Sequence, residues 1–266
     1  MSELERASAF EEALRDSCAE RVSETRFGPA LFNDTYARVW YINALRVERP
    51  GAATAREVAA EADRVQGAAG LAHRRVLLPP GDDRLAAGFG ELGWLPDHFV
   101  FMVRRRPPAR PVETKRVVEV EPLALEPLRH DIVREWLPGA DDEELRQVIA
   151  ADRLWWRLAN GHCFAIVERG TAVSAAVLFS DGRTAQVEDV ATMPAHRGRG
   201  YASAVVHRAV EAALETRHDF VFLVADADDW PKELYRRLGF DEVGEQWAFV
   251  RPPADPDGTR PADRAP

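Results

Sequence analysis

Cysteine is scarce in this chain of 266 residues, which has only Cys18 and Cys163. Two cysteines so far apart are too few for a disulfide framework, so we expect both to be reduced thiols in a core. The seven histidines show no His-x-x-x-His spacing, and we therefore expect no metal. No apolar run approaches the roughly 20 residues that span a bilayer, and the first residues are polar and acidic, unlike a secretory signal. These absences predict a cytoplasmic protein with no membrane partner.

The chain also has fewer basic than acidic side chains. The chain has 35 Lys and Arg against 44 Asp and Glu, a net charge of −9. Non-specific binding to a phosphate backbone needs a basic stripe, so we expect no nucleic-acid partner. An acidic protein is better suited to a cationic or amine substrate. With 46% hydrophobic and 30% charged residues, the composition indicates an ordinary globular protein, which we expect to be a monomer or a homodimer.

Helical and strand patterns alternate along the chain, which predicts an α/β fold (α+β, with a mixed sheet). The basic, proline-rich stretch from Arg105 to Pro111 has the composition of a linker. We therefore expect a first domain at 1–105, a linker at 106–114, a second domain at 115–251 and a disordered tail at 252–266. Helices are expected near residues 3–20, 54–69, 83–92, 128–136, 142–158, 200–216 and 231–238. Strands are expected near residues 38–46, 74–78, 98–104, 115–120, 163–168, 171–179, 184–192, 220–224 and 245–251.

The two halves of the sequence resemble each other at an offset of 146 positions. Leu92-Gly93-Trp94 corresponds to Leu238-Gly239-Phe240 at this offset, and three further pairs of segments also correspond. They are Val76-Leu77-Leu78 with Phe222-Leu223-Val224, Asp82-Asp83 with Asp228-Asp229, and Phe101 with Trp247. The same succession of strand, acidic turn, helix and strand therefore occurs twice, which indicates a duplicated fold.

The stretch from Val187 to Ser203 is the most informative part of the chain. A strand runs into a short loop with two glycines and two arginines, and the loop opens a helix. The first turn of a helix presents unpaired N–H groups and a positive dipole end, and glycine lets a phosphate approach them. The loop therefore predicts a pyrophosphate site. A dinucleotide fingerprint fits poorly because it needs three glycines after a first strand, and a solvated turn that merely caps the helix is the plain alternative.

Two motifs together extend this reading. Arg197-x-x-Gly200-x-Ala202 resembles the Gln/Arg-x-x-Gly-x-Gly/Ala signature of the GCN5-related N-acetyltransferase (GNAT) superfamily, and Leu234-Tyr235-x-x-x-Gly239-Phe240 is similar to its Leu-Tyr-x-x-x-Gly-Phe motif. The resemblance covers about residues 115–251. It implies two GNAT-like halves, each a mostly antiparallel sheet flanked by helices. It also implies that parallel strands 184–192 and 220–224 splay apart to hold acetyl-CoA as co-substrate.

The resemblance also implies the contacts of acetyl-CoA. Backbone groups near Val190 and Thr192 would pair with the pantetheine arm, and the Val190 N–H would stabilise the oxyanion of the thioester. Asp228 falls near a family Asn, and we expect it to cap the helix that begins at Pro231. The candidate cofactor-binding residues are Val190, Ala191, Thr192, Arg197, Gly198, Arg199, Gly200, Tyr201, Ala202, Ser203 and Asp228.

Two residues are candidates for catalysis. Tyr235 matches the general acid of the family, which protonates the departing thiolate; the alternative is an ordinary half-buried aromatic residue. Glu188 is the candidate base for the acceptor ammonium, although it could instead only orient or attract the amine. Strand alternation would place Glu188 with Val190 and Thr192 on one face, and Asp189 on the other.

The sequence therefore predicts an N-acetyltransferase that acts on a primary amine of a small molecule by direct transfer in a ternary complex. A peptide or protein N-acetyltransferase and a non-catalytic acyl-CoA-binding module are the alternatives. Phe89 stands where Tyr235 would be in the first half, so we expect that half to be a degenerate, non-catalytic copy. The adjacent Trp155 and Trp156 cannot share a helix face, so one should be core, and the other would line a pocket.

Overall fold

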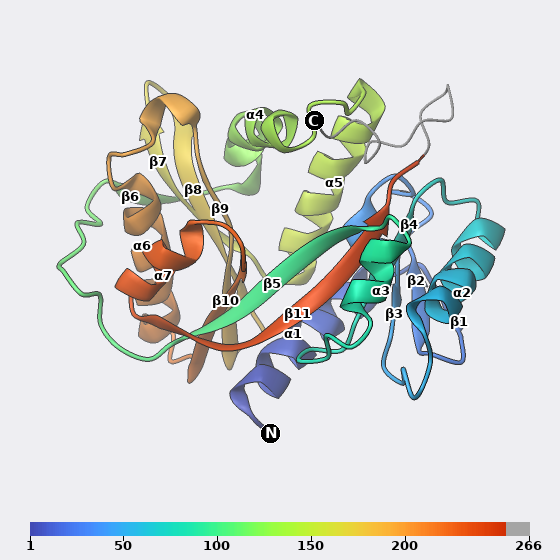
Figure 1. The fold of residues 1–266 in the computed structure, drawn as a ribbon. Helices are drawn as coiled ribbons and strands as arrows, with labels where there is room; N and C mark the ends of the chain where they lie inside the picture. Colours follow the sequence, from blue (N-terminus) through green and yellow to red (C-terminus); the bar gives the residue numbers. More distant parts are fainter. Residues whose placement is uncertain (254–266) are drawn as a thin grey trace. The chain divides into compact units, whose positions relative to one another are not determined.

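The computed structural model describes residues 1–253, and these residues fall into two compact units (Figure 1). Unit 1 comprises Met1–Leu14, Phe101–Ala225 and Asp229–Val243. Unit 2 comprises Arg15–Val100, Asp226–Asp228 and the chain from Gly244 onward. Each unit takes its residues from several separate stretches of the sequence.

The mixed sheet of unit 1 has the strand order β5-β10-β9-β8-β7-β6. Neighbouring strands from β6 to β9 are antiparallel, whereas β9 and β10 are parallel. The strands are β5 (Leu95–Arg104), β6 (Val117–Val120), β7 (His162–Glu168), β8 (Thr171–Ser180), β9 (Thr184–Thr192), β10 (Phe220–Asp226) and the start of β11 (Phe240–Arg251). The helices are α1 (Glu3–Cys18), α4 (Glu126–Trp136), α5 (Asp142–Leu158), α6 (Tyr201–Glu215) and α7 (Pro231–Arg237), with 3₁₀ turns η2 (Pro122–Leu125) and η3 (Pro194–His196).

Helices cover both faces of this sheet. On one face, buried residues of α4 and α5 pack with β8 and β9 in a single cluster that includes Leu128, Trp156, Val177 and Ala191. Helix α6 contributes no residue to that cluster and packs against β8 and β9 from the other side (Figure 1). Local sequence fixes the helix starts, as at α5, where the Asp141 carboxylate accepts a hydrogen bond from the Glu144 N–H (2.9 Å).

Strands β9 and β10 pair only where they begin. Their register runs from Phe220 opposite Thr184 to Phe222 opposite Gln186, although β9 continues to Thr192 and β10 to Asp226. The two parallel strands therefore separate toward their carboxyl ends. This observation bears out the mixed sheet with splayed parallel strands that the sequence predicted for the second half.

A β-bulge interrupts β9 just before this separation. Val177 lies opposite Glu188 and Ala175 opposite Ala191, so β9 carries one extra residue. Asp189 has a positive φ of 51°, as a residue in such a bulge does. The bulge reverses the alternation beyond it and brings Ala191 to the face of Val177. The expected regular alternation through Thr192 is therefore wrong.

Unit 2 has a hydrophobic core of its own. Its strand order is β1-β2-β3-β4-β11, and β4 pairs antiparallel with the second part of β11, with Val76 opposite Phe249. Its strands before β11 are β1 (Arg21–Glu24), β2 (Pro29–Phe32), β3 (Ala44–Arg46) and β4 (Arg74–Leu77), and its helices are α2 (Ala55–Ala68), α3 (Ala86–Glu91) and the 3₁₀ turn η1 (Trp40–Ile42). Helix α2 begins with a capping box between Thr54 and Glu57. Phe32, Leu45, Phe89 and Phe249 are among the residues of the core.

The duplicated succession that the sequence indicated is present in the structure. Elements α2, β4, α3 and β5 recur as α6, β10, α7 and β11 in the same order. Helices α2 and α6 start 146 residues apart, and so do strands β4 and β10. This correspondence supports a duplicated core, while the GNAT character of the first copy stays a prediction.

The compact units do not follow the boundaries expected from chain order. The expected boundary at 105–115 falls inside unit 1, where the Ala109 N–H in the proline-rich stretch donates to the Arg237 carbonyl (2.8 Å). Ala7 packs with Phe101 and Phe222, so most of α1 belongs to unit 1. The last strand, β11, is divided between the units. It begins in unit 1, and its second part belongs to unit 2, where it pairs with β4. The expected disordered tail lies, apart from its first two residues, outside the described residues.

One expected strand, at 38–46, is mostly absent. The buried amide of Asn43 donates to the carbonyls of Tyr36 and Val39 (both 2.9 Å), which bends the chain into η1 and leaves only the three residues of β3. Neither β1 nor β2 was predicted from the sequence. Strand β1 is short, polar and mostly exposed. Polar edge strands carry little hydrophobic signal.

Candidate active site

A cavity of about 720 Å³ lies in unit 1 beside the separated ends of β9 and β10. Residues of β9, of the glycine loop, of α4 and of α7 share its wall. The lining residues are Ile132, Glu135, Trp136, Val190, Ala191, Thr192, His196, Arg197, Gly198, Gly200, Tyr201, Ala202, Ser203, Asp229, Trp230, Pro231, Leu234 and Tyr235. The structure therefore gathers most of the predicted cofactor residues and Tyr235 around one space.

The glycine loop forms an open cradle at one end of this cavity. Gly198 and Gly200 both have φ of 76°, a conformation that glycine adopts without strain. A Cβ atom at either position would meet no protein atom within 4 Å. Gly200 is also the N-cap of α6 and no side chain caps that helix, so the amides of its first turn face the cradle uncapped. Unpaired amides and a helix dipole are what an anion needs here.

The two arginines of the loop have different partners. The Arg197 guanidinium forms a bidentate ion pair with Glu135 of α4 (2.9 and 2.7 Å) and donates to the Thr192 carbonyl (3.1 Å). This pairing lowers the pKa of Glu135. Arg199 donates to the Ala195 carbonyl (3.3 Å) and lines a second cavity. Arg197 thus ties the loop to α4 at the rim of the first cavity.

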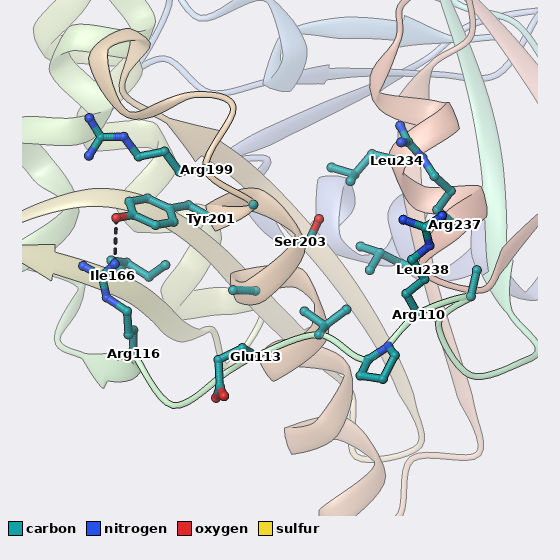
Figure 2. Close-up of a pocket in the computed structure, with 15 residues that line it drawn as sticks. Arg110, Glu113, Arg116, Ile166, Arg199, Tyr201, Ser203, Leu234, Arg237 and Leu238 are labelled. Carbon is teal, nitrogen blue, oxygen red and sulfur yellow. Dashed lines mark hydrogen bonds between the residues drawn. The ribbon is translucent and has the colours of Figure 1, made fainter.

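The second cavity has a volume of about 730 Å³ and shares Gly200, Tyr201, Ser203 and Leu234 with the first. Four guanidinium groups line it, and Figure 2 shows them on two sides of the cavity. They belong to Arg110, Arg116, Arg199 and Arg237. Sequence reasoning missed all of these except Arg199, because Arg110 and Arg116 belong to neither motif and Arg237 stands at a variable position of the Leu-Tyr-x-x-x-Gly-Phe motif.

The hydroxyl of Tyr201 forms two hydrogen bonds in the wall of the second cavity. It accepts a hydrogen bond from Arg116 (2.8 Å), which Figure 2 shows. It also donates to Glu168 (2.6 Å), which the Arg116 guanidinium contacts as well (2.8 Å). The hydrogen bonds from Tyr201 and Arg116 lower the pKa of Glu168. The side chain of Tyr201 is therefore committed to the protein, which leaves its backbone N–H for the cradle.

Tyr235 lies on α7 with only 7% of its surface exposed, and it lines the first cavity. Burial raises the pKa of its phenol, and the negative charges of Glu188 and Asp229 raise it further. The phenol is therefore protonated at neutral pH and can serve as a proton donor. Its ring packs edge-on against Phe240 with centroids 6.4 Å apart.

Glu188 precedes the bulge and keeps a partly exposed side chain. Gln186 Nε2 donates to its carboxylate (2.6 Å). Burial raises its pKa well above the ordinary range, and the charges of Glu11 and Asp189 add to this effect. A carboxylate with a raised pKa binds a proton more tightly near neutral pH, as a general base requires.

Asp189, unlike Glu188, is bound to side chains of the neighbouring helices. Because of the bulge it lies on the α4–α5 side, where it accepts a hydrogen bond from Trp156 Nε1 (2.5 Å) and pairs with Arg129 (3.1 Å). Arg129 is buried and also pairs with Asp152 (2.7 Å). These ion pairs and this hydrogen bond hold the bulge in place from the α4–α5 side of the sheet.

Two expectations about neighbouring residues differ from the structure. Asp228 does not cap α7, since the N-cap is Trp230 and no side chain caps that helix. Asp228 belongs instead to unit 2, where its carboxylate lies 3.3 Å from His98 Nδ1. The physical reason is that the chain bends at Asp229, whose own carboxylate accepts from the Trp230 N–H (2.7 Å).

The expectation for Trp155 and Trp156 holds only in part, since Trp155 lines neither cavity. Trp156 is core, with 1% exposure, and Trp155 is partly buried against the same cluster. The indoles that line the cavity are Trp136, with 58% exposure, and Trp230, with 62%. Trp230 was not a candidate, because an isolated tryptophan in a loop carries no periodic signal.

The structure thus brings the splayed parallel strands, the open glycine cradle and the protonated phenol to one cavity, as the resemblance to the GNAT superfamily implied. The family model of the acetyltransferase (GNAT) family matches residues 125–240, and this part of the chain is a domain of that family. The match contains β9, the cradle, α7 and Tyr235. Within residues 1–253, no group of three or more His, Cys, Asp or Glu could hold a metal ion, and no helix there is apolar and long enough to cross a membrane.

Several solved structures share the fold. A conserved protein of unknown function from Staphylococcus epidermidis has a TM-score of 0.64 at 15% identity, over 87% of this chain and 93% of that one. A GCN5-related N-acetyltransferase from Kribbella flavida has a TM-score of 0.58 at 16% identity, over 92% and 94%. A tandem GNAT protein from the clavulanic acid biosynthesis pathway has a TM-score of 0.51 at 13% identity, over 73% and 68%. At these identities the likeness concerns the fold alone.

Proposed function

We propose that the protein is an N-acetyltransferase that moves an acetyl group from acetyl-CoA to a primary amine of a small molecule, by direct transfer in a ternary complex. The observation that carries this proposal is that one cavity is lined both by the open glycine cradle and by the phenol of Tyr235. An anion site and a proton donor in a single cavity match the pyrophosphate and the sulfur of coenzyme A.

The residues of the two cavities fit coenzyme A. The amides of Tyr201, Ala202 and Ser203 in the uncapped first turn of α6 suit the pyrophosphate. The four guanidiniums of the second cavity suit the remaining phosphate, because planar guanidiniums bind phosphate oxygens in pairs. When bound, acetyl-CoA supplies an activated thioester. Arg197 is now paired with Glu135, so it would bind a phosphate of acetyl-CoA only if that phosphate replaced the Glu135 carboxylate.

Three groups of the chain would act on the reacting atoms. The bulge takes Val190 out of register with β8, and this leaves its N–H for the developing oxyanion. Tyr235 would give its proton to the departing sulfur, and Glu188 would take a proton from the acceptor ammonium. The family resemblance assigned these roles, and the burial and charge around Tyr235 and Glu188 support them.

The wall on the α4 side suits a cationic acceptor. Trp136 and Trp230 present exposed indoles to the cavity, and Asp229 adds a carboxylate. Indole faces attract organic cations, and the carboxylate attracts an ammonium. These features favour a small amine over the peptide alternative.

Binding and turnover separate this proposal from its alternatives. We expect coenzyme A to raise the melting temperature in a thermal-shift assay, because a ligand that binds only the folded state stabilises it. We also expect free thiol release from acetyl-CoA with at least one member of a panel of polyamines, aminoglycosides and amino acids. Activity on N-terminal peptides alone would assign a peptide N-acetyltransferase, and binding without turnover would assign an acyl-CoA-binding module.

The second cavity gives a further prediction. Replacing Arg237 by Gln should weaken binding of coenzyme A by about 10- to 100-fold, since a charge-assisted contact to phosphate contributes roughly 1.5–3 kcal/mol. Binding of 3′-dephospho-coenzyme A should change much less. Arg236→Gln is the matched control, because Arg236 pairs with Glu233 and Glu242 and does not line the cavity. Calorimetric titration measures both ligands; an equal loss for both would remove the assignment of this cavity to the 3′-phosphate.

A further inference from the structure

Helix α1 brings a second carboxylate to the candidate base. Gln186 Nε2 donates both to Glu188 (2.6 Å) and to Glu11, so one amide nitrogen joins a carboxylate of α1 to a carboxylate of β9. Gln186 is fully buried and Glu11 is 7% exposed. All three residues belong to unit 1. The other amide atom, Gln186 Oε1, is buried without a hydrogen-bond partner among the described residues.

Burying two carboxylates around one hydrogen-bond donor lowers the stability of the folded protein. Like charges this close disfavour each other's ionisation, and removal from water adds to the cost. An apolar pair at these positions would pack without either cost. The negative charge of one carboxylate therefore makes its neighbour bind a proton more tightly.

We infer that Glu11 is a positioning residue: Gln186 holds its carboxylate beside that of Glu188, and its negative charge makes Glu188 a better acceptor for the proton of the substrate ammonium. The inference rests on the proposed acetyl transfer only for the source of that proton. Glu188 is the member that keeps partial exposure, so it is the one that can receive the proton.

The proton balance is complete with the groups named. The unprotonated Glu188 takes one proton from the ammonium, and the freed nitrogen lone pair forms the bond to the thioester carbon while the carbon–sulfur bond breaks. Tyr235 gives its proton to the sulfur and is reprotonated by the second proton that the nitrogen loses. The proton on Glu188 then leaves to solvent, and the net products are an amide, a thiol and one proton.

The other charges near Glu188 are accounted for. Asp189 on β9 is paired with Arg129 of α4, which also binds Asp152 of α5. Tyr235 of α7 is protonated. Besides burial, the causes that raise the pKa of Glu188 are the charges of Glu11 and Asp189. Because Asp189 has its own cation, Glu11 is the charge whose removal should change Glu188 most.

The test is the variant Glu11→Gln, assayed for kcat/KM against pH with the best amine of the panel. Removal of the Glu11 charge should lower the pKa of Glu188, so the acidic limb of the profile should move down by about one pH unit. Glu11→Asp, which keeps the charge, should retain most of the original limb. Glu12→Gln is the matched control, because Glu12 is on the same helix and its carboxylate binds Ser8 (3.0 Å). An unmoved limb in Glu11→Gln, or an equal shift in Glu12→Gln, would contradict the inference.

A second readout does not depend on turnover. In protein with ¹³C-labelled glutamate carboxyls, assigned with Glu188→Gln, the Glu188 signal should titrate well above the ordinary carboxyl range and move down in Glu11→Gln. A normal midpoint in the unaltered protein overturns the inference without any Glu11 variant. If the titration behaves as expected but no amine is acetylated, the carboxylate pair stands and the proposed function fails.

Discussion

Replacing Tyr235 by Phe should lower kcat by about 10²–10³-fold, within the range of a lost general acid, and leave the affinity for coenzyme A nearly unchanged. The phenol is kept protonated by burial and by the negative charge of Glu188 and Asp229, so it is a proton donor across the working pH range. Without it the thiolate must leave unprotonated. Steady-state thiol release and calorimetric titration with coenzyme A give the two quantities.

The duplicated fold indicates that this variant will fold. At the 146-residue offset, Phe89 occupies the place of Tyr235 and Trp94 that of Phe240. Phe89 packs edge-on against Trp94 with centroids 5.2 Å apart, much as Tyr235 packs against Phe240. The protein itself therefore accommodates Phe at this position of the repeat. A loss of kcat in Tyr235→Phe can then be attributed to the hydroxyl.

Tyr36→Phe in unit 2 is a suitable control, because it removes a phenol from a residue that lines neither cavity. It should retain full turnover. If Tyr235→Phe also retained full turnover, the thiolate would be leaving without help, and Tyr235 would be the ordinary half-buried aromatic residue of the alternative reading.

The sequence predicted the parts of the site that local geometry requires. A positive φ at Gly198 and Gly200 admits few other residues, so the cradle leaves a trace in the chain itself. The same holds for the segment around Tyr235, where Gly239 has φ of 96° and a Cβ there would lie 1.9 Å from the Arg106 carbonyl oxygen. Motifs of this kind report backbone constraints that only a few residues can meet.

Parts of the site that depend on distant contacts left no such trace. The bulge at Asp189 needs Arg129 of α4 and Trp156 of α5, both more than 30 positions away in the chain. Glu11 reaches Gln186 across 175 positions. The grouping of residues into units follows packing of the chain ends, as with α1 and β11, and no spacing in the sequence encodes which sheet a terminal strand joins.

Replacing Gly200 by Ala should weaken binding of coenzyme A by at least about 100-fold, because the cradle would lose both its backbone conformation and its open space. The φ of 76° disfavours any side chain, at a cost of about 1 kcal/mol. The added Cβ meets no protein atom within 4 Å, so the methyl group lies in the space that we assign to the pyrophosphate. The loss of affinity should therefore exceed the loss of stability.

Gly182→Ala separates these two effects. Gly182 lies between β8 and β9 with φ of 88°, and a Cβ there also meets nothing within 4 Å. Both variants should lower the melting temperature by a similar amount, whereas only Gly200→Ala should lose coenzyme A binding in calorimetric titration. Equal affinities in the two variants would mean that no phosphate lies against Gly200. The roles given to Val190, Glu188 and Tyr235 would then lack the bound thioester on which they act, so this comparison tests the site at its first step.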